Sequence, residues 1–253
     1  MKFEQVRKGV EGVPFISVDN GRLLYEFILE HKPKHILELG VGYGTSSCYI
    51  AAALDELGSG RLTCVDLVSM KDHFEPSLEK QIADLNLTTY VEVHRMQSGY
   101  NWFLHDKIAK NSQNEAKTCK PQYDLIFIDG PKNWIIDSSS FFLADKLLND
   151  KGWILWDDYN WKYENASNPE MTDGVSHRSM SKAEMTTAHI KEVFHLLVMQ
   201  HPSYNNFKIH AEEDWAWAQK TEQDHKEVKY VTSRSFRSII MSFVLKLKRR
   251  LFK

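Results

Sequence analysis

The fold is decided by the stretch His35-Ile36-Leu37-Glu38-Leu39-Gly40-Val41-Gly42-Tyr43-Gly44-Thr45-Ser46-Ser47. An apolar run, a turn with glycine at every second position and the start of a helix follow one another in it. Glycine permits positive φ and lets the backbone approach a ligand closely, and the free N–H groups of a helix N-terminus favour a negative group. The stretch therefore predicts a strand, a turn and a helix that together form a nucleotide-cofactor site.

The spacing of the glycines narrows the choice of cofactor. A dinucleotide site has Gly-x-Gly-x-x-Gly, but Thr45 stands where the third glycine belongs, and the lysine of a phosphate-binding P-loop is missing. The pattern Glu-Leu-Gly-x-Gly-x-Gly-x-Ser-Ser resembles the first motif of class I S-adenosylmethionine-dependent methyltransferases. In that family the loop holds the methionine end and the ribose of the cofactor. The resemblance therefore implies cofactor contacts at these residues: Glu38, Gly40, Gly42, Gly44 and Ser46. Another Rossmann-like protein or a plain strand-to-helix turn could carry the same glycines, so the rest of the chain must decide.

The composition is that of an ordinary globular protein with an uneven charge distribution. The chain has 253 residues, 42% of them hydrophobic and 26% charged, and a net charge of −2. Residues 232–253 hold seven of the 32 Lys and Arg residues and none of the 34 Asp and Glu residues. The remaining chain is therefore acidic, which argues against nucleic-acid binding. We expect a methyltransferase domain over residues 1–231 and a basic helix over residues 232–253.

The basic C-terminal segment is amphipathic. From Phe236 its apolar residues recur at i, i+3, i+4 and i+7 between the Lys and Arg residues. Such a helix can lie on an anionic membrane surface, where each basic residue contributes about 1 kcal/mol. It can equally pack on the body or in a homodimer, and the sequence leaves both open. No apolar run approaches ~18 residues and no signal peptide is evident, so we expect a cytoplasmic protein, with peripheral contact at the inner face of the membrane as the alternative.

Strand and helix patterns alternate along the chain. Residues 1–18 and 111–122 look irregular, residues 159–181 look like a loop, and the final strand pair looks like a hairpin. Strands are predicted over 35–39, 61–66, 90–94, 123–129, 152–158, 207–211 and 214–219, and helices over 19–33, 45–56, 75–86, 98–110, 138–149 and 182–200. Repeated strand-then-helix units predict a Rossmann-like, doubly wound, mostly parallel seven-stranded sheet with an antiparallel C-terminal hairpin. Ligands bind such sheets at the carboxyl ends of the strands.

Polar residues follow the second and third predicted strands. Asp66 lies at the end of the second strand, roughly 20 residues beyond the glycines, where an acid accepts the two hydroxyl groups of a ribose. Gln97 and Ser98 come directly after the third strand. In class I methyltransferases the residues at that place contact the adenine. The resemblance therefore implies adenine contacts at Gln97 and Ser98.

Three aspartates follow the fourth and fifth predicted strands. Asp129 ends the fourth strand, and Asp157 with Asp158 ends the fifth. Because the carboxyl ends of parallel strands meet at one edge of the sheet, these carboxylates should converge close to the glycine loop. Carboxylates brought together either share a proton or bind a hard cation such as Mg²⁺ or Ca²⁺. We also expect Asp129 to contact the cofactor.

These residues resemble the active site of the cation-dependent catechol and caffeoyl-CoA O-methyltransferases. That family has Asp with Lys three residues later, then Asp-Asn, and this chain has Asp129, Lys132, Asp157 and Asp158. The resemblance implies that a metal on the three aspartates holds a substrate hydroxyl, with Asp129 and Lys132 catalytic. Lys132 would remove the proton, its pKa lowered by the cation. Asp158 in place of Asn is a departure, which bacterial relatives that methylate natural products or cell-surface sugars share.

The sequence as a whole indicates an S-adenosylmethionine-dependent O-methyltransferase that uses a divalent cation such as Mg²⁺ and acts on a hydroxyl of a small molecule or sugar. An NAD(P)-dependent oxidoreductase would share the glycine loop and Asp66, but Thr45 and the lack of a hydride-transfer site disfavour it. A non-catalytic, membrane-associated adaptor with this fold is the third alternative.

Overall fold

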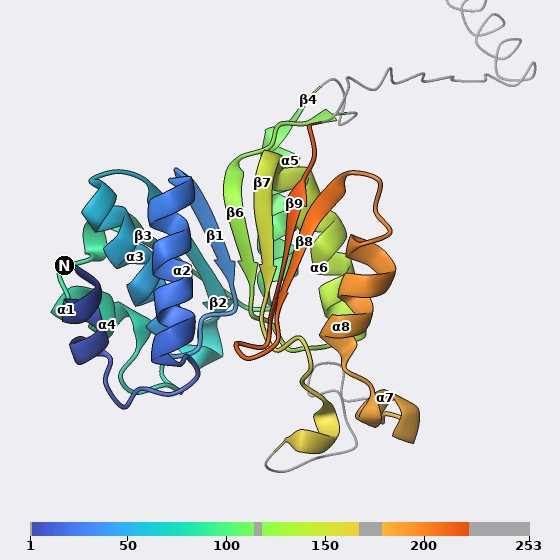
Figure 1. Ribbon diagram of the computed structural model, residues 1–253, viewed down its shortest axis with the longest axis horizontal. Coiled ribbons are helices and arrows are strands. Elements are labelled where there is room, and N and C mark those ends of the chain that lie inside the picture. Colours follow the sequence, from blue (N-terminus) through green and yellow to red (C-terminus); the bar gives the residue numbers. More distant parts are fainter. Residues whose placement is uncertain (1, 114–117, 167–178, 223–253) are drawn as a thin grey trace, which may run out of the picture. The chain divides into compact units, whose positions relative to one another are not determined.

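A computed structural model describes residues 2–113, 118–166 and 179–222. Its centre is a seven-stranded sheet in the order β3-β2-β1-β6-β7-β9-β8 (Figure 1). The strands are β1 (His35–Leu39), β2 (Arg61–Leu67), β3 (Val91–Met96), β6 (Tyr123–Ile128), β7 (Leu148–Trp156), β8 (Tyr204–His210) and β9 (Trp215–Lys220). Neighbouring strands are parallel except where β9 pairs with β7 and β8. This confirms the predicted Rossmann-like, doubly wound, mostly parallel sheet with an antiparallel C-terminal hairpin.

Helices cover both faces of the sheet because the strand side chains alternate between two buried clusters. On β1, Ile36 packs into one cluster, whereas Leu37 and Leu39 pack into the other. The first cluster lies under α1 (Lys2–Gly9), α2 (Val18–His31), α3 (Thr45–Leu57) and α4 (Leu78–Asp84). The second lies under α5 (Tyr100–Asn111), α6 (Trp134–Leu147) and α8 (His189–Val193). Figure 1 shows α2 and α3 on one side of the sheet and α5, α6 and α8 on the other.

The order of the strands places the site. The chain fills the sheet outward from β1 to β3, then returns to add β6 and β7 on the other side of β1. Ligands of open α/β sheets bind at such a reversal, outside the carboxyl ends of the strands. The glycine turn follows β1, and Asp129 and Asp157 directly follow β6 and β7. The segments that carry the predicted site residues therefore meet at one edge.

Two helices begin earlier than predicted because a different side chain caps them. The helix predicted over 19–33 is α2, whose N-cap is Ser17; the Ser17 hydroxyl accepts a backbone N–H of the first turn at 3.0 Å. The helix predicted over 138–149 begins at Trp134, because the side chain of Asn133 accepts two backbone N–H groups at 2.9 and 3.1 Å. Apolar periodicity by itself does not locate either cap, so both helices start before the predicted residue.

The helix predicted over 182–200 is divided. It consists of α7 (Lys182–Thr186), α8 and a π-helical turn, Phe194–Val198, and Thr187 between the first two has an extended backbone (φ −93°, ψ 136°). At the break, one ring nitrogen of His189 accepts the backbone N–H of Trp134 at 3.1 Å, and the other lies 2.9 Å from the carbonyl of Glu184. Contacts with α6 thus override the local helical pattern.

Short elements occur within the segments predicted to be irregular. Residues 2–9 form α1, whose Phe3 is buried against Tyr49 with ring centroids 5.3 Å apart. The polar segment 111–122 carries a two-stranded ladder. The remaining short elements are β4 (Ser112–Gln113), β5 (Thr118–Cys119) and the 3₁₀ turns Val68–Met70, Thr88–Tyr90 and Tyr163–Asn165.

Several expectations fall outside the described residues. The basic helix over 232–253, the domain boundary at residue 231 and most of the loop over 159–181 lie there, so they stay predictions. Within the described ranges, no helix is both long and apolar enough to cross a bilayer.

Candidate cofactor and cation site

The turn between β1 and α3 has the backbone geometry that its glycines predict. Gly40, Gly42 and Gly44 have φ of 86°, 54° and 86°, in the region that side chains rarely adopt. Gly44 is also the N-cap of α3 and provides no side chain to bond the first N–H groups of the helix. The turn therefore leaves the N-terminus of α3 open towards the cavity described below.

Asp66, at the end of β2, holds this turn in place. Its Oδ2 accepts the backbone N–H groups of Val41 at 3.1 Å and Gly42 at 3.0 Å, and its Oδ1 accepts that of Leu67 at 2.7 Å. A carboxylate has about four acceptor positions. Three of them are used here, so the ribose contact predicted for Asp66 would have to share the carboxylate with the turn.

Glu38 lies beneath the turn and is not among the cavity-lining residues. The side chain is fully buried and accepts hydrogen bonds from the hydroxyl groups of Ser46 and Ser47, the latter at 2.5 Å. Burial raises the pKa of Glu38 to about 7, although the two serines oppose the shift. In the structure Glu38 links β1 to the first turn of α3 through these hydrogen bonds. Because Glu38 does not line the cavity, the structure does not support the predicted contact between Glu38 and the cofactor.

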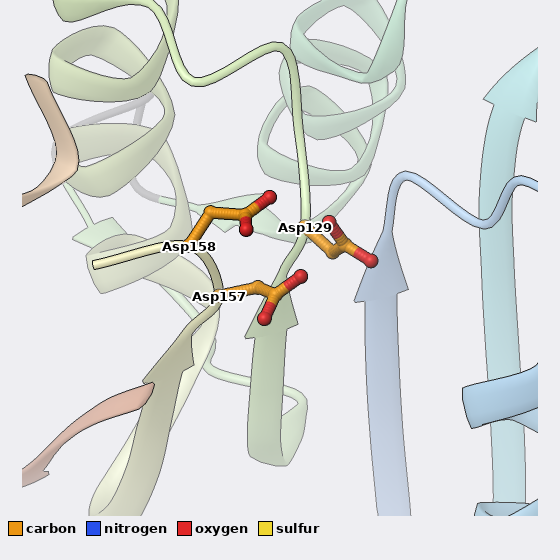
Figure 2. Close-up of side chains that lie close together, drawn as sticks. All are labelled: Asp129, Asp157 and Asp158. Carbon is orange, nitrogen blue, oxygen red and sulfur yellow. The ribbon is translucent and has the colours of Figure 1, made fainter. Parts of the chain in front are cut away.

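The three predicted aspartates do converge. Asp129, Asp157 and Asp158 can each direct one oxygen into a group whose members lie within 4.8 Å of one another, and all three are half-buried. Figure 2 shows Asp157 with one oxygen directed towards Asp129 and the other directed away from it. Asp158 has φ of 53°, which turns the chain sharply after β7. This turn brings two consecutive aspartates to one cluster.

Lys132 completes the cluster. Its Nζ lies 2.9 Å from Asp129 Oδ1 and 2.9 Å from Asp158 Oδ2. Burial alone would lower the pKa of Lys132, but the charges of Asp129, Asp158 and Asp157 raise it above its usual value. The amine is therefore protonated in this arrangement. Its raised pKa is opposite in direction to the lowered pKa that is expected beside a bound cation.

Acidic groups outnumber basic groups in the cluster formed by the three aspartates and Lys132. Burial raises the pKa of Asp157 well above its usual range, and the charges of Asp129 and Asp158 raise it further. Burial also raises the pKa of Asp158, where Lys132 opposes the shift. Three carboxyl groups beside one amine provide an all-oxygen donor set, and a hard divalent cation would take the place of the protons that the raised pKa values of Asp157 and Asp158 retain. The residues present therefore fit such an ion.

A cavity of about 660 Å³ joins the glycine turn to the aspartate cluster. This volume is typical of a site for a cofactor-sized ligand. The predicted residues that line it are Gly40, Gly42, Gly44, Ser46, Asp66, Ser98, Asp129, Lys132, Asp157 and Asp158. Glu38 and Gln97 are the two predicted site residues that are not part of the lining. Gln97 is exposed just beyond β3.

Several further parts of the lining were not predicted. Among them, Ser17 and Asn20 lie at the N-terminus of α2, and Glu213 with Asp214 lies in the turn between β8 and β9. These two segments are joined, because Asn20 Nδ2 donates to the carbonyl of Glu213 at 2.9 Å. The capping position of Ser17 was a signal in the sequence, but the contact across 193 residues was not.

Comparisons with known proteins agree with this geometry. Residues 37–159 match the family model described as "Methyltransferase domain". No curated protein matches the chain. The family match confirms the methyltransferase resemblance inferred from the sequence, over a segment that runs from β1 to just beyond the Asp157–Asp158 pair.

Solved structures share the fold. An O-methyltransferase from Bacillus cereus in complex with SAH is 19% identical, with a TM-score of 0.57, and the match covers 87% of this chain and 90% of that one. The O-methyltransferase TomG from Streptomyces achromogenes, in complex with SAM, is 17% identical with a TM-score of 0.56 and the same coverage. The SAH-bound methyltransferase PaMTH1 from Podospora anserina is 16% identical, with a TM-score of 0.56, covering 88% of this chain and 86% of that one.

Proposed function

We propose that the protein transfers a methyl group from S-adenosylmethionine to a hydroxyl oxygen of a small molecule or sugar, since residues 37–159 match a methyltransferase domain. The observation that carries the proposal is that the glycine turn and the aspartates Asp129, Asp157 and Asp158 line the same cavity. A cofactor at one end and an acceptor at the other would then meet within one enclosure.

The glycine turn is assigned to the cofactor. Its backbone is held by Asp66, and the N-terminus of α3 faces the cavity. S-adenosylmethionine supplies an electrophilic methyl group on its sulfonium. The family resemblance assigns Ser98 to the adenine, and Ser98 lines the cavity; Gln97 lies outside the lining and would contact the adenine only after moving.

The acidic cluster is assigned to a divalent cation, Mg²⁺ being the expected one. Asp129, Asp157 and Asp158 would hold it, and it would supply Lewis acidity that favours ionisation of an acceptor hydroxyl. Lys132 Nζ is assigned as the group that takes the hydroxyl proton. The amine can do so only when the charge of the surrounding carboxylates is neutralised, because these carboxylates raise its pKa.

Binding and turnover test the proposal in two steps. Calorimetry with SAH, with NADH as the comparison ligand, should give micromolar binding of the first and none of the second. Acceptor screening with and without Mg²⁺ follows, and Asp157→Ala should end turnover while SAH affinity stays as in the unaltered protein. Binding of NADH instead of SAH would contradict the proposal and favour the oxidoreductase alternative.

A further inference from the structure

One of the three aspartates, Asp157, is hydrogen-bonded by a tryptophan at the start of β9. The indole Nε1 of Trp215 donates a hydrogen bond to Asp157 Oδ1 at 2.6 Å. In the antiparallel ladder between β7 and β9, Trp156 pairs with Ala216, so the next positions in register are Asp157 and Trp215. The contact is thus a consequence of strand register, and Trp215 itself is fully buried.

We infer that Trp215 is a positioning residue of the cation site, a role that rests on the cation assigned under the proposed function. A carboxylate can rotate about its Cβ–Cγ bond, and a hydrogen bond to one oxygen fixes that rotation. Trp215 donates to Oδ1, and the cluster takes one oxygen from Asp157. The inference is that Trp215 reserves one Asp157 oxygen for the cluster, in the way that outer partners orient metal ligands elsewhere.

The neighbouring tryptophans show that packing alone does not require this bond. Trp217 lies two residues further along β9, is 2% exposed and belongs to the same buried cluster as Trp215. The indole N–H of Trp217 has no hydrogen-bond partner within the described part of the chain, and the same is true of Trp156. Burial of a tryptophan on this sheet is therefore possible without a polar partner, and the bond at Trp215 is specific to Asp157.

The aromatic ring of Trp215 also packs against Phe127, with ring centroids 5.7 Å apart. Trp215→Phe keeps an aromatic ring in this place and removes the N–H donor. Trp217→Phe makes the same change two residues away, where no bond is lost. Replacing Trp215 by the benzothienyl analogue of tryptophan, which has sulfur in place of the N–H group, removes the donor and preserves the bicyclic shape.

The experiment measures Mn²⁺ binding by electron paramagnetic resonance, SAH binding by calorimetry and thermal unfolding for the full chain and the three variants. Trp215→Phe and the benzothienyl variant should bind Mn²⁺ about 10- to 100-fold more weakly. Trp217→Phe should change the Mn²⁺ affinity by less than about twofold, because no ligand of the cluster is touched. SAH affinity should stay within about twofold of the unaltered protein in all three variants, since the glycine turn is intact.

The outcomes separate this inference from the proposed function. Unchanged Mn²⁺ affinity in the benzothienyl variant would overturn the positioning role, as would equal losses in Trp215→Phe and Trp217→Phe. If the unaltered protein binds SAH but no Mn²⁺, the cation site and the positioning role of Trp215 are both contradicted, whereas the proposed methyl transfer is not. An unaltered protein that binds no SAH would contradict the proposed function itself.

Discussion

The backbone at Gly40 presses against the backbone of Asp129. A Cβ added at Gly40 would lie 1.9 Å from the carbonyl oxygen of Asp129. The strands are paired at this point, because Asp129 N–H donates to the carbonyl of Leu39 at 2.8 Å. The start of the cofactor turn and the first aspartate of the cluster are therefore fixed relative to each other by direct backbone contact.

Gly40→Ala should therefore disrupt the site. The change combines a φ of 86° with a clash against backbone atoms that cannot rotate away. We expect a loss of more than about 4 kcal/mol in the free energy of unfolding, or failure to fold. Urea denaturation measures the first outcome, and calorimetry with SAH measures the accompanying loss of cofactor binding.

Gly58→Ala is the matched control for that change. Gly58 also has positive φ, 63°, but an added Cβ would meet nothing within 4 Å. Only the backbone strain remains, and it should cost roughly 1–2 kcal/mol. Equal losses in the two variants would show that the contact with Asp129 is not what requires glycine at residue 40.

The buried carboxyl of Glu38 should make stability depend on pH. Its folded-state pKa of about 7 lies above the usual value of 4.5. The protonated form therefore contributes stability that is fully present below the unfolded-state pKa and is lost as pH rises through about 7. Glu38→Gln cannot ionise. The free energy of unfolding of the variant minus that of the unaltered protein should rise by about 3 kcal/mol between pH 4.5 and pH 7.5. Urea denaturation across this range measures it, and a difference independent of pH would show that Glu38 is not protonated in the fold.

Asp66→Asn should weaken cofactor binding through the turn. The aspartate uses both oxygens to accept three backbone N–H groups, and an amide would direct its NH₂ group at one of those donors. We expect a loss of about 1–3 kcal/mol in stability and weaker SAH binding by calorimetry. Asp84→Asn is the control, because the Asp84 carboxylate pairs with Lys80 at an exposed place on α4. SAH affinity that is the same in Asp66→Asn and Asp84→Asn would contradict the role given to Asp66.

Asp158→Asn should test the charge of the cluster without changing the backbone turn at residue 158. Asn adopts positive φ readily, so the turn at 53° should persist while one negative charge and the carboxylate partner of Lys132 are removed. We expect about tenfold weaker Mn²⁺ binding with SAH affinity unchanged, measured as above. Tighter Mn²⁺ binding in the variant would mean that the third carboxylate does not act as a ligand.

The sequence by itself determined the seven strands of the main sheet, the glycine turn and the residues at the strand ends. The apolar run 125–128, which is followed by an acid and a glycine, is typical of a buried parallel strand, and the glycines mark a backbone that needs positive φ. The convergence of Asp129, Asp157 and Asp158 followed from the rule that parallel strands end at one edge. These signals are local, so one chain is enough to read them.

The tertiary structure alone decided which groups these residues contact. Glu38 is on the same face of β1 as Ile36, but only the fold brings the hydroxyl groups of Ser46 and Ser47 to its carboxylate, beneath the turn and away from the cavity. Asn20 meets Glu213, and Trp215 meets Asp157, only because β9 enters the sheet between β7 and β8. Contacts between segments distant in sequence depend on sheet order and register, which no local pattern encodes. The sequence therefore specified the chemical groups of the site, and the packing of the sheet specified their partners.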